Sequence, residues 1–491
     1  MTDVKRPNLT ILPALHTFTT GSIVRCIAAA VLVLSIIAVY RWAPHKVLAR
    51  TCVPPSDPGL LADDATDVHA VDEYKAAVGR MLQQERFEQL DCLADSLRRS
   101  KERFAGGMWK LHIFYSGLEA PLLHPTPQDW DDHINRLKHW QSANRKSLTA
   151  RVALAESYLG YAWYARGEGT SDTVSESGWQ LFGHRAEEAR NILQKASTLD
   201  AADPEWYVAM ESVSLAQGWD REQARTLLEQ AINAEPGYYY VYRMHALYLL
   251  PKWYGEDGDT ELFAERMADR LGGEQGDAVY FQIAGFLVCN CNDQPQLSHM
   301  SWPRIQSGFA ALEKQYGTSL TNLNLLAQMA VKLKDAVVAD KAFQRIGEQW
   351  SESSWRTQSY FESSRNWASQ VAPSMTAKQS IEAEVAANLA TAEGTRYQAA
   401  FEKSFATLMH QCAPRREGDD VPFEMLVQVG PGGTVKGMMS DTSTAVSVCL
   451  FQKLMNSEMT HAAPFPPPPQ APYWVRLNLS PPPYSASLPP Q

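Results

Sequence analysis

The chain has 491 residues, which is too long for one ordinary hydrophobic core and predicts two or three domains. Hydrophobic residues at 45% and charged residues at 20% are globular values, and they exclude wholesale disorder. The net charge of −10, with no local basic cluster, argues against nucleic acid as a partner.

The N-terminal part carries a candidate membrane segment. Residues 1–22 are polar, and a charge-free run from Cys26 to Tyr40 follows. At ~1.5 Å per residue this run spans about 22 Å, so it must be extended to approach the ~30 Å of a bilayer core. Extension to residues 23–42 places Arg25 and Arg41 near the edges, where long cationic side chains reach the interface. We therefore predict a transmembrane signal anchor at 23–42.

Two alternatives to a retained anchor are a buried soluble helix and a cleaved signal peptide. Residues 47–49 offer small side chains near a possible cleavage site, but cationic Arg41 and Lys46 lie where such signals are usually neutral. Cations on both sides of the segment leave its orientation open. Residues 43–66, which contain Pro and Asp, predict a linker.

Residues 67–411 carry the periodicity of amphipathic helices. The second-helix pattern of a tetratricopeptide-type hairpin, Ala-x3-Leu-x2-Ala, recurs there. The copies are Ala189/Leu193/Ala196, Ala224/Leu228/Ala231 and Ala339/Phe343/Ile346. The first two copies lie 35 residues apart, close to the ~34-residue period of these repeats. Since one hairpin cannot bury its own apolar face, we predict a mainly α, stacked helical-hairpin array.

The stretch after the second copy is unusually aromatic. Pro236 ends the preceding helix, and Tyr-rich sequence continues from Tyr238 to Trp253. Core packing accounts for most aromatic residues of this kind. The alternative is a binding surface on the array. The candidates for that surface are Tyr239, Tyr242, Arg243 and Trp253.

The composition changes after residue 411. The expected elements are strands at 423–429 and 435–439, a helix at 445–455 and a strand at 473–479. This order predicts a small α+β domain over residues 412–480, followed by a Pro-rich tail at 481–491. So small a core is marginal. A Cys412–Cys449 disulfide would close a loop of 38 residues and could add about 2–4 kcal/mol of stability.

No local pattern indicates catalysis, because the sequence lacks G-x-S-x-G, H-E-x-x-H and a phosphate loop. Cys289 and Cys291, with His299, could hold a soft metal, but free or locally oxidised thiols are the simpler interpretation. We therefore expect no cofactor and no enzymatic activity. Scattered carboxylates could still converge in space, so an envelope hydrolase with a dispersed active site is an alternative.

Six dispersed motifs occur in order between residues 74 and 350. They are Gly107–Leu111, Tyr161–Gly167, Tyr238–Arg243, Leu249–Trp253, Gly258–Asp259 and Gly276–Asp277. With these motifs the region resembles the bacterial domain-of-unknown-function family 4034. The resemblance implies a helical-repeat fold and assigns no activity.

The C-terminal part combines an apolar strand, a Gly-rich turn with Thr434-Val435, a helix, Phe465-Pro466 and a closing strand. This pattern resembles the TonB C-terminal-like domain, which lies in the periplasm of Gram-negative bacteria. The resemblance implies a periplasmic C-terminal bulk and a cytoplasmic N-terminus. A TonB-like energy transducer is an alternative function. However, the chain lacks the Pro/Lys-rich spacer of a transducer and carries Cys412 and Cys449, which favours an adaptor.

These features predict a single-pass inner-membrane protein whose periplasmic helical-repeat domain binds a protein or peptide partner in the cell envelope. Helical arrays present extended concave binding surfaces. An exposed sheet edge in the small domain can add a strand from a partner.

Overall fold

The computed structural model describes residues 57–121, 124–199, 202–290, 295–409, 411–412, 414, 418–459 and 465–483. The predicted anchor at 23–42, its flanks at 1–22 and 43–56 and most of the C-terminal tail lie outside these residues. Within the described ranges, no helix is both long enough and apolar enough to cross a membrane. The described chain is mainly α-helical and ends in a small antiparallel sheet of three strands. At this level the predicted fold class is confirmed.

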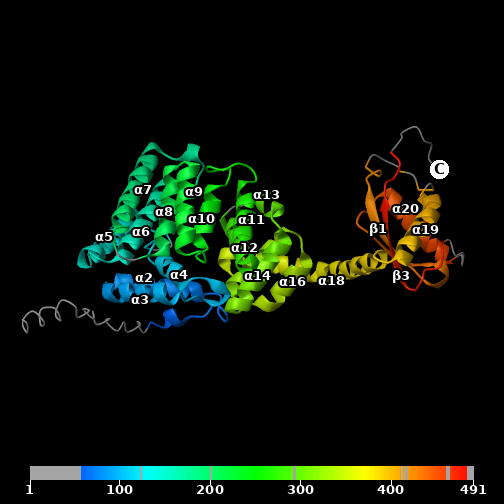
Figure 1. Cartoon of the computed structure of the whole chain (residues 1–491), viewed down its shortest axis with the longest axis horizontal. Helices are drawn as coiled ribbons and strands as arrows, with labels where there is room; N and C mark the ends of the chain where they lie inside the picture. Colours follow the sequence, from blue (N-terminus) through cyan, green and yellow to red (C-terminus); the bar gives the residue numbers. More distant parts are fainter. Residues whose placement is uncertain are drawn as a thin grey trace, which may run out of the picture.

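A large body contains helices α2 to α17. Their bounds are α2 (Ala70–Gln83), α3 (Phe87–Ser100), α4 (Lys110–Ser116), α5 (Pro127–Ala143), α6 (Leu148–Arg166), α7 (Glu176–Ala196), α8 (Pro204–Gln217), α9 (Arg221–Ala234), α10 (Tyr240–Tyr248), α11 (Asp259–Leu271), α12 (Gly273–Asn290), α13 (Pro295–His299), α14 (Trp302–Tyr316), α15 (Leu320–Lys332), α16 (Ala336–Ile346) and α17 (Glu352–Trp355). Most pack as successive hairpins, such as α6 with α7, α8 with α9 and α15 with α16, and α5 to α10 stand side by side in Figure 1.

The three repeated sequence sets lie on α7, α9 and α16, which are second helices of their hairpins. All nine side chains of these sets are buried. Ala189, Ala224 and Ala339 are fully buried, and their small size lets the neighbouring helix approach closely. The sets therefore mark the inner face of each second helix.

The first two helices depart from the hairpin pattern. In Figure 1, α2 and α3 lie across the ends of the upright helices rather than beside them. Their buried residues, including Tyr74, Leu90 and Leu97, belong to the same hydrophobic core as residues of α10 and α15. The N-terminal helices thus complete the core of the large body instead of adding another hairpin to its end.

Hydrogen bonds of Asp64 link the start of the described chain to the N-terminal end of α15. Its carboxylate accepts hydrogen bonds from the hydroxyls of Thr321 (2.7 Å) and Ser319, and its backbone carbonyl accepts one from the Leu320 N–H (3.0 Å). Ser319 is the N-cap of α15, so the carboxylate lies at the positive end of that helix. Burial nevertheless raises the pKa of Asp64 to about 6, because the charged form loses its water.

A single long helix, α18 (Gln358–Leu389), connects the large body to a small domain at its far end (Figure 1). At ~1.5 Å per residue, its 32 residues extend about 48 Å. Phe361 and Ala368 anchor its first half in the core of the large body. Val385 is the buried residue of its second half.

The small domain contains α19 (Ala392–Met409), β1 (Phe423–Val429), β2 (Val435–Ser440), α20 (Ala445–Met459) and β3 (Tyr473–Leu479). The sheet order is β2-β1-β3, and both pairs are antiparallel. The predicted order of strand, strand, helix and strand is confirmed. The structure also packs α19 on this core, where Phe401 stacks on Phe465 with ring centroids 4.2 Å apart. The second core thus begins at Tyr397, inside the range predicted for the array.

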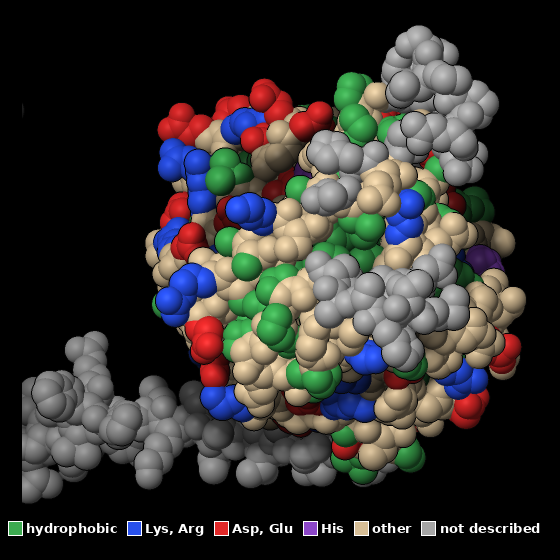
Figure 2. Space-filling view, turned by 90° about the vertical axis from the view of Figure 1, so that its right-hand side faces the viewer, with side chains coloured by type: hydrophobic (Ala, Val, Ile, Leu, Met, Phe, Trp, Pro, Cys, Tyr) green, Lys and Arg blue, Asp and Glu red, His purple; other side chains and the backbone are tan. Residues whose placement is uncertain are grey.

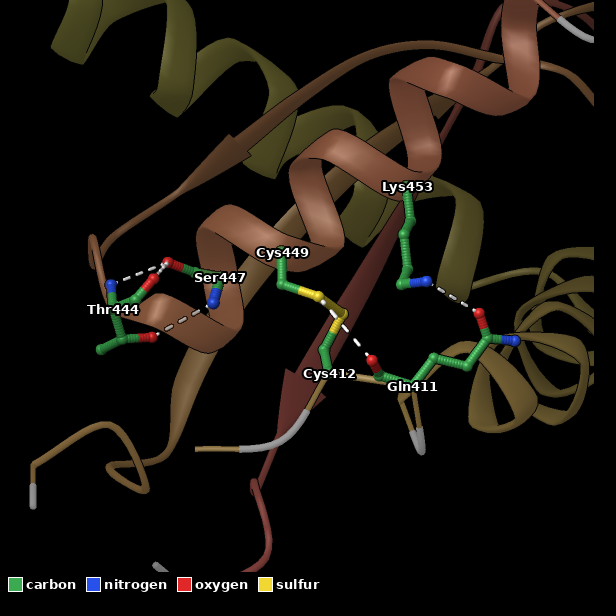
Figure 3. The surroundings of a disulfide bond; sticks show 6 residues. All are labelled: Gln411, Cys412, Thr444, Ser447, Cys449 and Lys453. Atoms are coloured by element: carbon green, nitrogen blue, oxygen red, sulfur yellow. Dashed lines mark hydrogen bonds between the residues drawn. A yellow bond between two sulfur atoms is a disulfide. The ribbon is translucent and has the colours of Figure 1, made fainter. Parts of the chain in front are cut away.

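A disulfide joins Cys412 to Cys449 of α20, as predicted (Figure 3). Beside it, Lys453 Nζ donates to the side-chain oxygen of Gln411 (3.1 Å). Cys92 on α3 is disulfide-bonded as well. The Cys412–Cys449 bond ties the chain after α19 to α20 and so closes the small core covalently.

We expect Asp64 to give the unfolding free energy a measurable pH dependence. Because its pKa is 3.8 in a free chain and about 6 in the fold, the folded state holds a proton that the unfolded state releases. Its contribution to stability is full below pH ~4 and is lost as the pH rises through ~6. The unfolding free energy should therefore fall by up to about 3 kcal/mol more in the natural chain than in Asp64→Asn.

Denaturant unfolding at pH 4 and pH 7 measures this difference. The amide of Asp64→Asn does not titrate, so comparing the two chains removes the effect of every other ionisable group. The same pH dependence in both chains would contradict a buried, proton-binding Asp64.

Candidate binding surface

Two of the predicted surface residues lie in the core. Tyr239 and Tyr242 are only 3% and 0% exposed. The Tyr239 hydroxyl donates to the carbonyl of Gly107 (2.7 Å), and the Tyr242 hydroxyl donates to the carbonyl of Pro236 (3.0 Å). Burial raises the pKa of both hydroxyls, so both stay protonated donors. These rings pack the interior, and an exposed binding role for them does not fit this structure.

The Gly106–Trp109 segment packs against the tyrosine stretch. The Trp109 indole N–H donates to the carbonyl of Gly237 (3.0 Å), and its backbone N–H donates to the Tyr240 hydroxyl (3.2 Å). The ring of Trp109 meets that of Tyr238 edge to face, with centroids 4.8 Å apart. The aromatic stretch therefore binds another part of the same chain.

The other side of the segment reaches α14 and α15. The Asn322 amide donates to the carbonyl of Gly106 (2.9 Å). The Arg103 guanidinium lies 4.1 Å from the ring centroid of Trp109 and 4.7 Å from that of Tyr316, and it donates to the Tyr316 hydroxyl (2.6 Å). One short segment thus joins α10, α14 and α15.

Arg243, the third predicted residue, is half-buried. Its guanidinium lies 5.1 Å from the ring centroids of both Tyr239 and Tyr240, within the range of a cation–π contact. It also donates to the side-chain carbonyl of Gln282 on α12. Arg243 therefore links α10 to α12, and only part of it faces solvent.

Buried charged groups lie next to the tyrosines. Asp203 pairs with Arg98 and accepts a hydrogen bond from the Tyr115 hydroxyl (2.5 Å). Glu205 contacts the His112 ring nitrogen (2.9 Å). Burial raises the pKa of Asp203, although the neighbouring Arg98 opposes the shift. These pairs hold α3 and α4 against α8.

Glu156 of α6 completes this network. Burial, together with the nearby Glu205 carboxylate, raises the pKa of Glu156 well above its usual value. The two carboxyl groups lie close enough for their titrations to be coupled, so burial and their mutual repulsion both disfavour the charged form of Glu156. In the part of the chain that the structure describes, no group of three or more His, Cys, Asp or Glu is placed to hold a metal ion. Cys291 lies outside that part.

Trp253, the fourth predicted residue, belongs to a different site. The guanidinium carbon of Arg166 lies 5.6 Å from the ring centroids of Trp163 and Trp179 and 5.8 Å from that of Trp253. Phe182 packs against Trp163 with centroids 4.9 Å apart. These five residues form the Arg166 aromatic cluster.

Helical spacing builds this cluster. Trp163 and Arg166 are three residues apart in the last turn of α6, so they share a face. Trp179 and Phe182 have the same spacing in the first turns of α7. Trp253 comes from the turn between α10 and α11 and reaches Trp163 at a centroid distance of 5.6 Å. Three segments therefore meet at one end of their hairpins.

The Arg166 aromatic cluster faces solvent on one side. Trp179 is 39% exposed, and Tyr254, which follows Trp253, is 38% exposed. Tyr164 and Leu181 are exposed at the same end. Trp, Tyr and Arg are the residues that most often dominate the binding energy of protein interfaces. The composition of this end is therefore that of an interface centre.

Two buried donors of the cluster have no hydrogen-bond partner among the described residues, namely Arg166 Nε and Trp253 Nε1. Arg166 Nη1, in contrast, donates to the carbonyls of Gly167 and Gly169 (3.0 Å each). A buried donor without a partner costs about 1–3 kcal/mol. Such atoms also occur in the core, for example Arg243 Nε and Trp130 Nε1, so it is the exposed rings that distinguish the cluster.

A groove of about 550 Å³ lies in the small domain between α19 and the end of β3. Phe405, Met409 and Leu477 line its apolar part. Next to it, the Arg476 N–H donates to the Gln398 side chain (3.3 Å), so α19 covers the edge of β3 at this point. Seen from this end of the molecule, hydrophobic side chains lie across the middle of the face (Figure 2). Val421, Val448 and Phe451 are exposed hydrophobic residues of this domain.

No protein-family model, curated protein or solved structure matches this chain. The resemblances to family 4034 and to the TonB C-terminal-like domain therefore rest on sequence motifs alone.

We expect Gly106→Ala to destabilise the protein by more than about 2 kcal/mol, because backbone strain and a clash combine. Gly106 has φ +68°, and a Cβ there would lie 2.4 Å from Ser319 Cβ and 2.5 Å from Asn322 Nδ2. Gly258→Ala is the matched control, since Gly258 has φ +87° with nothing within 4 Å of a Cβ. It should cost only the backbone strain of about 1–2 kcal/mol. Urea unfolding compares the two, and equal losses would contradict close docking at Gly106.

Proposed function

We propose that the chain is a single-pass inner-membrane protein, anchored through residues 23–42, that binds a protein or peptide partner in the bacterial cell envelope. Residues 67–411 would form a tetratricopeptide-like array in the periplasm, and residues 412–480 a TonB-like adaptor domain. The observation that carries the proposal is the solvent-facing Arg166 aromatic cluster. It combines the residue types of an interface centre with buried donors that the fold leaves unpaired.

The cysteines support a periplasmic location. Disulfides persist in oxidising compartments and are rare in the cytosol. The Cys412–Cys449 bond and the oxidised state of Cys92 are therefore expected of a chain whose bulk lies outside the cytoplasm. The charge-free run within residues 23–42 then supplies the anchor.

The small domain offers a second docking place for the same role. The groove between α19 and β3 is partly apolar, and it lies at the end of β3, beyond Arg476, whose backbone is bonded by Gln398 of α19. An extended peptide can bond to such an edge through its backbone while its side chains enter the groove. An adaptor with two separate surfaces can hold two partners or two parts of one partner.

The hydrolase alternative would require Glu156 and Glu205 to act on a substrate. Their partners, however, are His112, Tyr238 and each other, all within the core of the large body. The shifted pKa of Glu156 follows from this burial. Such a network favours a structural role, so the adaptor is preferred.

Site-specific photo-crosslinking in living cells tests the proposal. A benzophenone amino acid replaces Tyr164 in the full-length chain; Tyr164 is exposed in the last turn of α6, follows Trp163 of the cluster in sequence, and has its ring near those of Trp130 and Tyr161. We expect one discrete adduct with an envelope protein. The matched control replaces Tyr360, an equally exposed tyrosine on α18, and should give no such adduct. No adduct at either position, or the same adducts at both, would contradict a specific adaptor surface at this end.

A further inference from the structure

Acidic side chains surround the Arg166 aromatic cluster. Three connecting segments flank the cluster, at residues 167–176, 218–222 and 251–259. Their exposed carboxylates include Glu168, Asp172, Glu176, Asp220, Glu256 and Asp257. The second and third segments lie close together, since the side chain of Arg221 donates to the carbonyl of Tyr254 (3.2 Å).

The cations at this end do not balance the acidic rim. Arg221 is paired with Asp259 (2.6 Å). Arg166 is half-buried among the indoles, and its Nη1 is bound by two loop carbonyls. Lys252 is the remaining cation of the three segments. A ligand that approaches the exposed ring of Trp179 therefore meets mainly negative charge around an apolar centre.

This charge distribution selects among possible partners. Anionic lipid surfaces and nucleic acids would be repelled by the rim. A cationic partner would be attracted, and opposite charges outside an apolar centre set orientation and raise the association rate. The exposed rings of Trp179 and Tyr254 supply flat surfaces on which an aromatic or a guanidinium group can stack.

We propose that the Arg166 aromatic cluster and its acidic rim dock a basic segment of a partner protein, in which Lys or Arg flank an aromatic side chain. The aromatic side chain packs on Trp179 and Tyr254, and the flanking cations face Glu168, Glu256 and Asp257. This inference rests on the proposed adaptor function and names the chemistry of the partner at that surface.

The test uses the purified full-length chain and two labelled peptides, one of alternating Lys and Trp and one of alternating Glu and Trp. Fluorescence anisotropy measures the affinity of each. We expect the Lys-Trp peptide to bind at least about tenfold more tightly than the Glu-Trp peptide at low salt. The difference should shrink as salt screens the rim.

Variants locate the binding. Trp179→Ala should lower the affinity of the chain for the Lys-Trp peptide at least about tenfold. The affinity for the Lys-Trp peptide should lose most of its dependence on salt concentration in the triple variant Glu168→Gln, Glu256→Gln and Asp257→Asn. Because all four side chains are exposed, the fold should be retained, and thermal melting checks this.

The matched controls are Tyr360→Ala and Glu362→Gln, which change an exposed aromatic ring and an exposed carboxylate on α18. Both should leave peptide affinity unchanged. Equal affinity for the two peptides, or binding that these controls weaken as much as Trp179→Ala does, would overturn the inference. A Tyr164 adduct that persists in the Trp179→Ala chain would leave the adaptor intact but would refute this docking chemistry.

Discussion

The large body depends on the docking of the Gly106–Trp109 segment against the aromatic stretch that begins at Tyr238. Trp109 contributes both its indole N–H and its backbone N–H to this contact, and Tyr239 closes it from the other side by donating to Gly107. Together with the Arg98–Asp203 pair and the hydrogen bonds of Asp64, this contact sets the position of the N-terminal helices on the hairpins. Tyr74 and Leu97, on the apolar faces of these helices, belong to the same core as Trp109.

This arrangement separates stability from recognition. The tyrosines and the Arg98–Asp203 network use their polar atoms internally, so they fix α3, α4, α8 and α10 relative to one another. At the Arg166 aromatic cluster, in contrast, large rings are exposed to solvent, and Arg166 Nε and Trp253 Nε1 are unpaired, as Arg243 Nε is beside the tyrosines. Functional sites commonly retain such locally unfavourable features, which the rest of the fold must offset.

The helices and strands could be predicted from the sequence because local residue patterns determine them. Strand β1 has the bounds that its residue types predicted, and β3 those that its alternation predicted. The small residues of α7, α9 and α16 are buried, as their spacing indicated. The roles of Tyr239 and Tyr242 could not be derived, since their partners Gly107 and Pro236 are recognisable only in the fold. The same holds for the cluster. Its spacings within α6 and α7 are visible, but Trp253 joins them through a turn far along the chain.

The most direct test of the contact between the Gly106–Trp109 segment and the tyrosine stretch is a double-mutant cycle on Trp109→Leu and Tyr238→Leu, measured by urea unfolding of the full chain. The two rings meet edge to face at 4.8 Å. Aromatic pairs of this kind stabilise a fold by about 0.5–1.5 kcal/mol beyond the contribution of their buried area. The losses of unfolding free energy in the two single variants should therefore be non-additive by at least ~0.5 kcal/mol. Strictly additive losses would mean that the segment and the tyrosine stretch stabilise the protein independently, which would contradict the account.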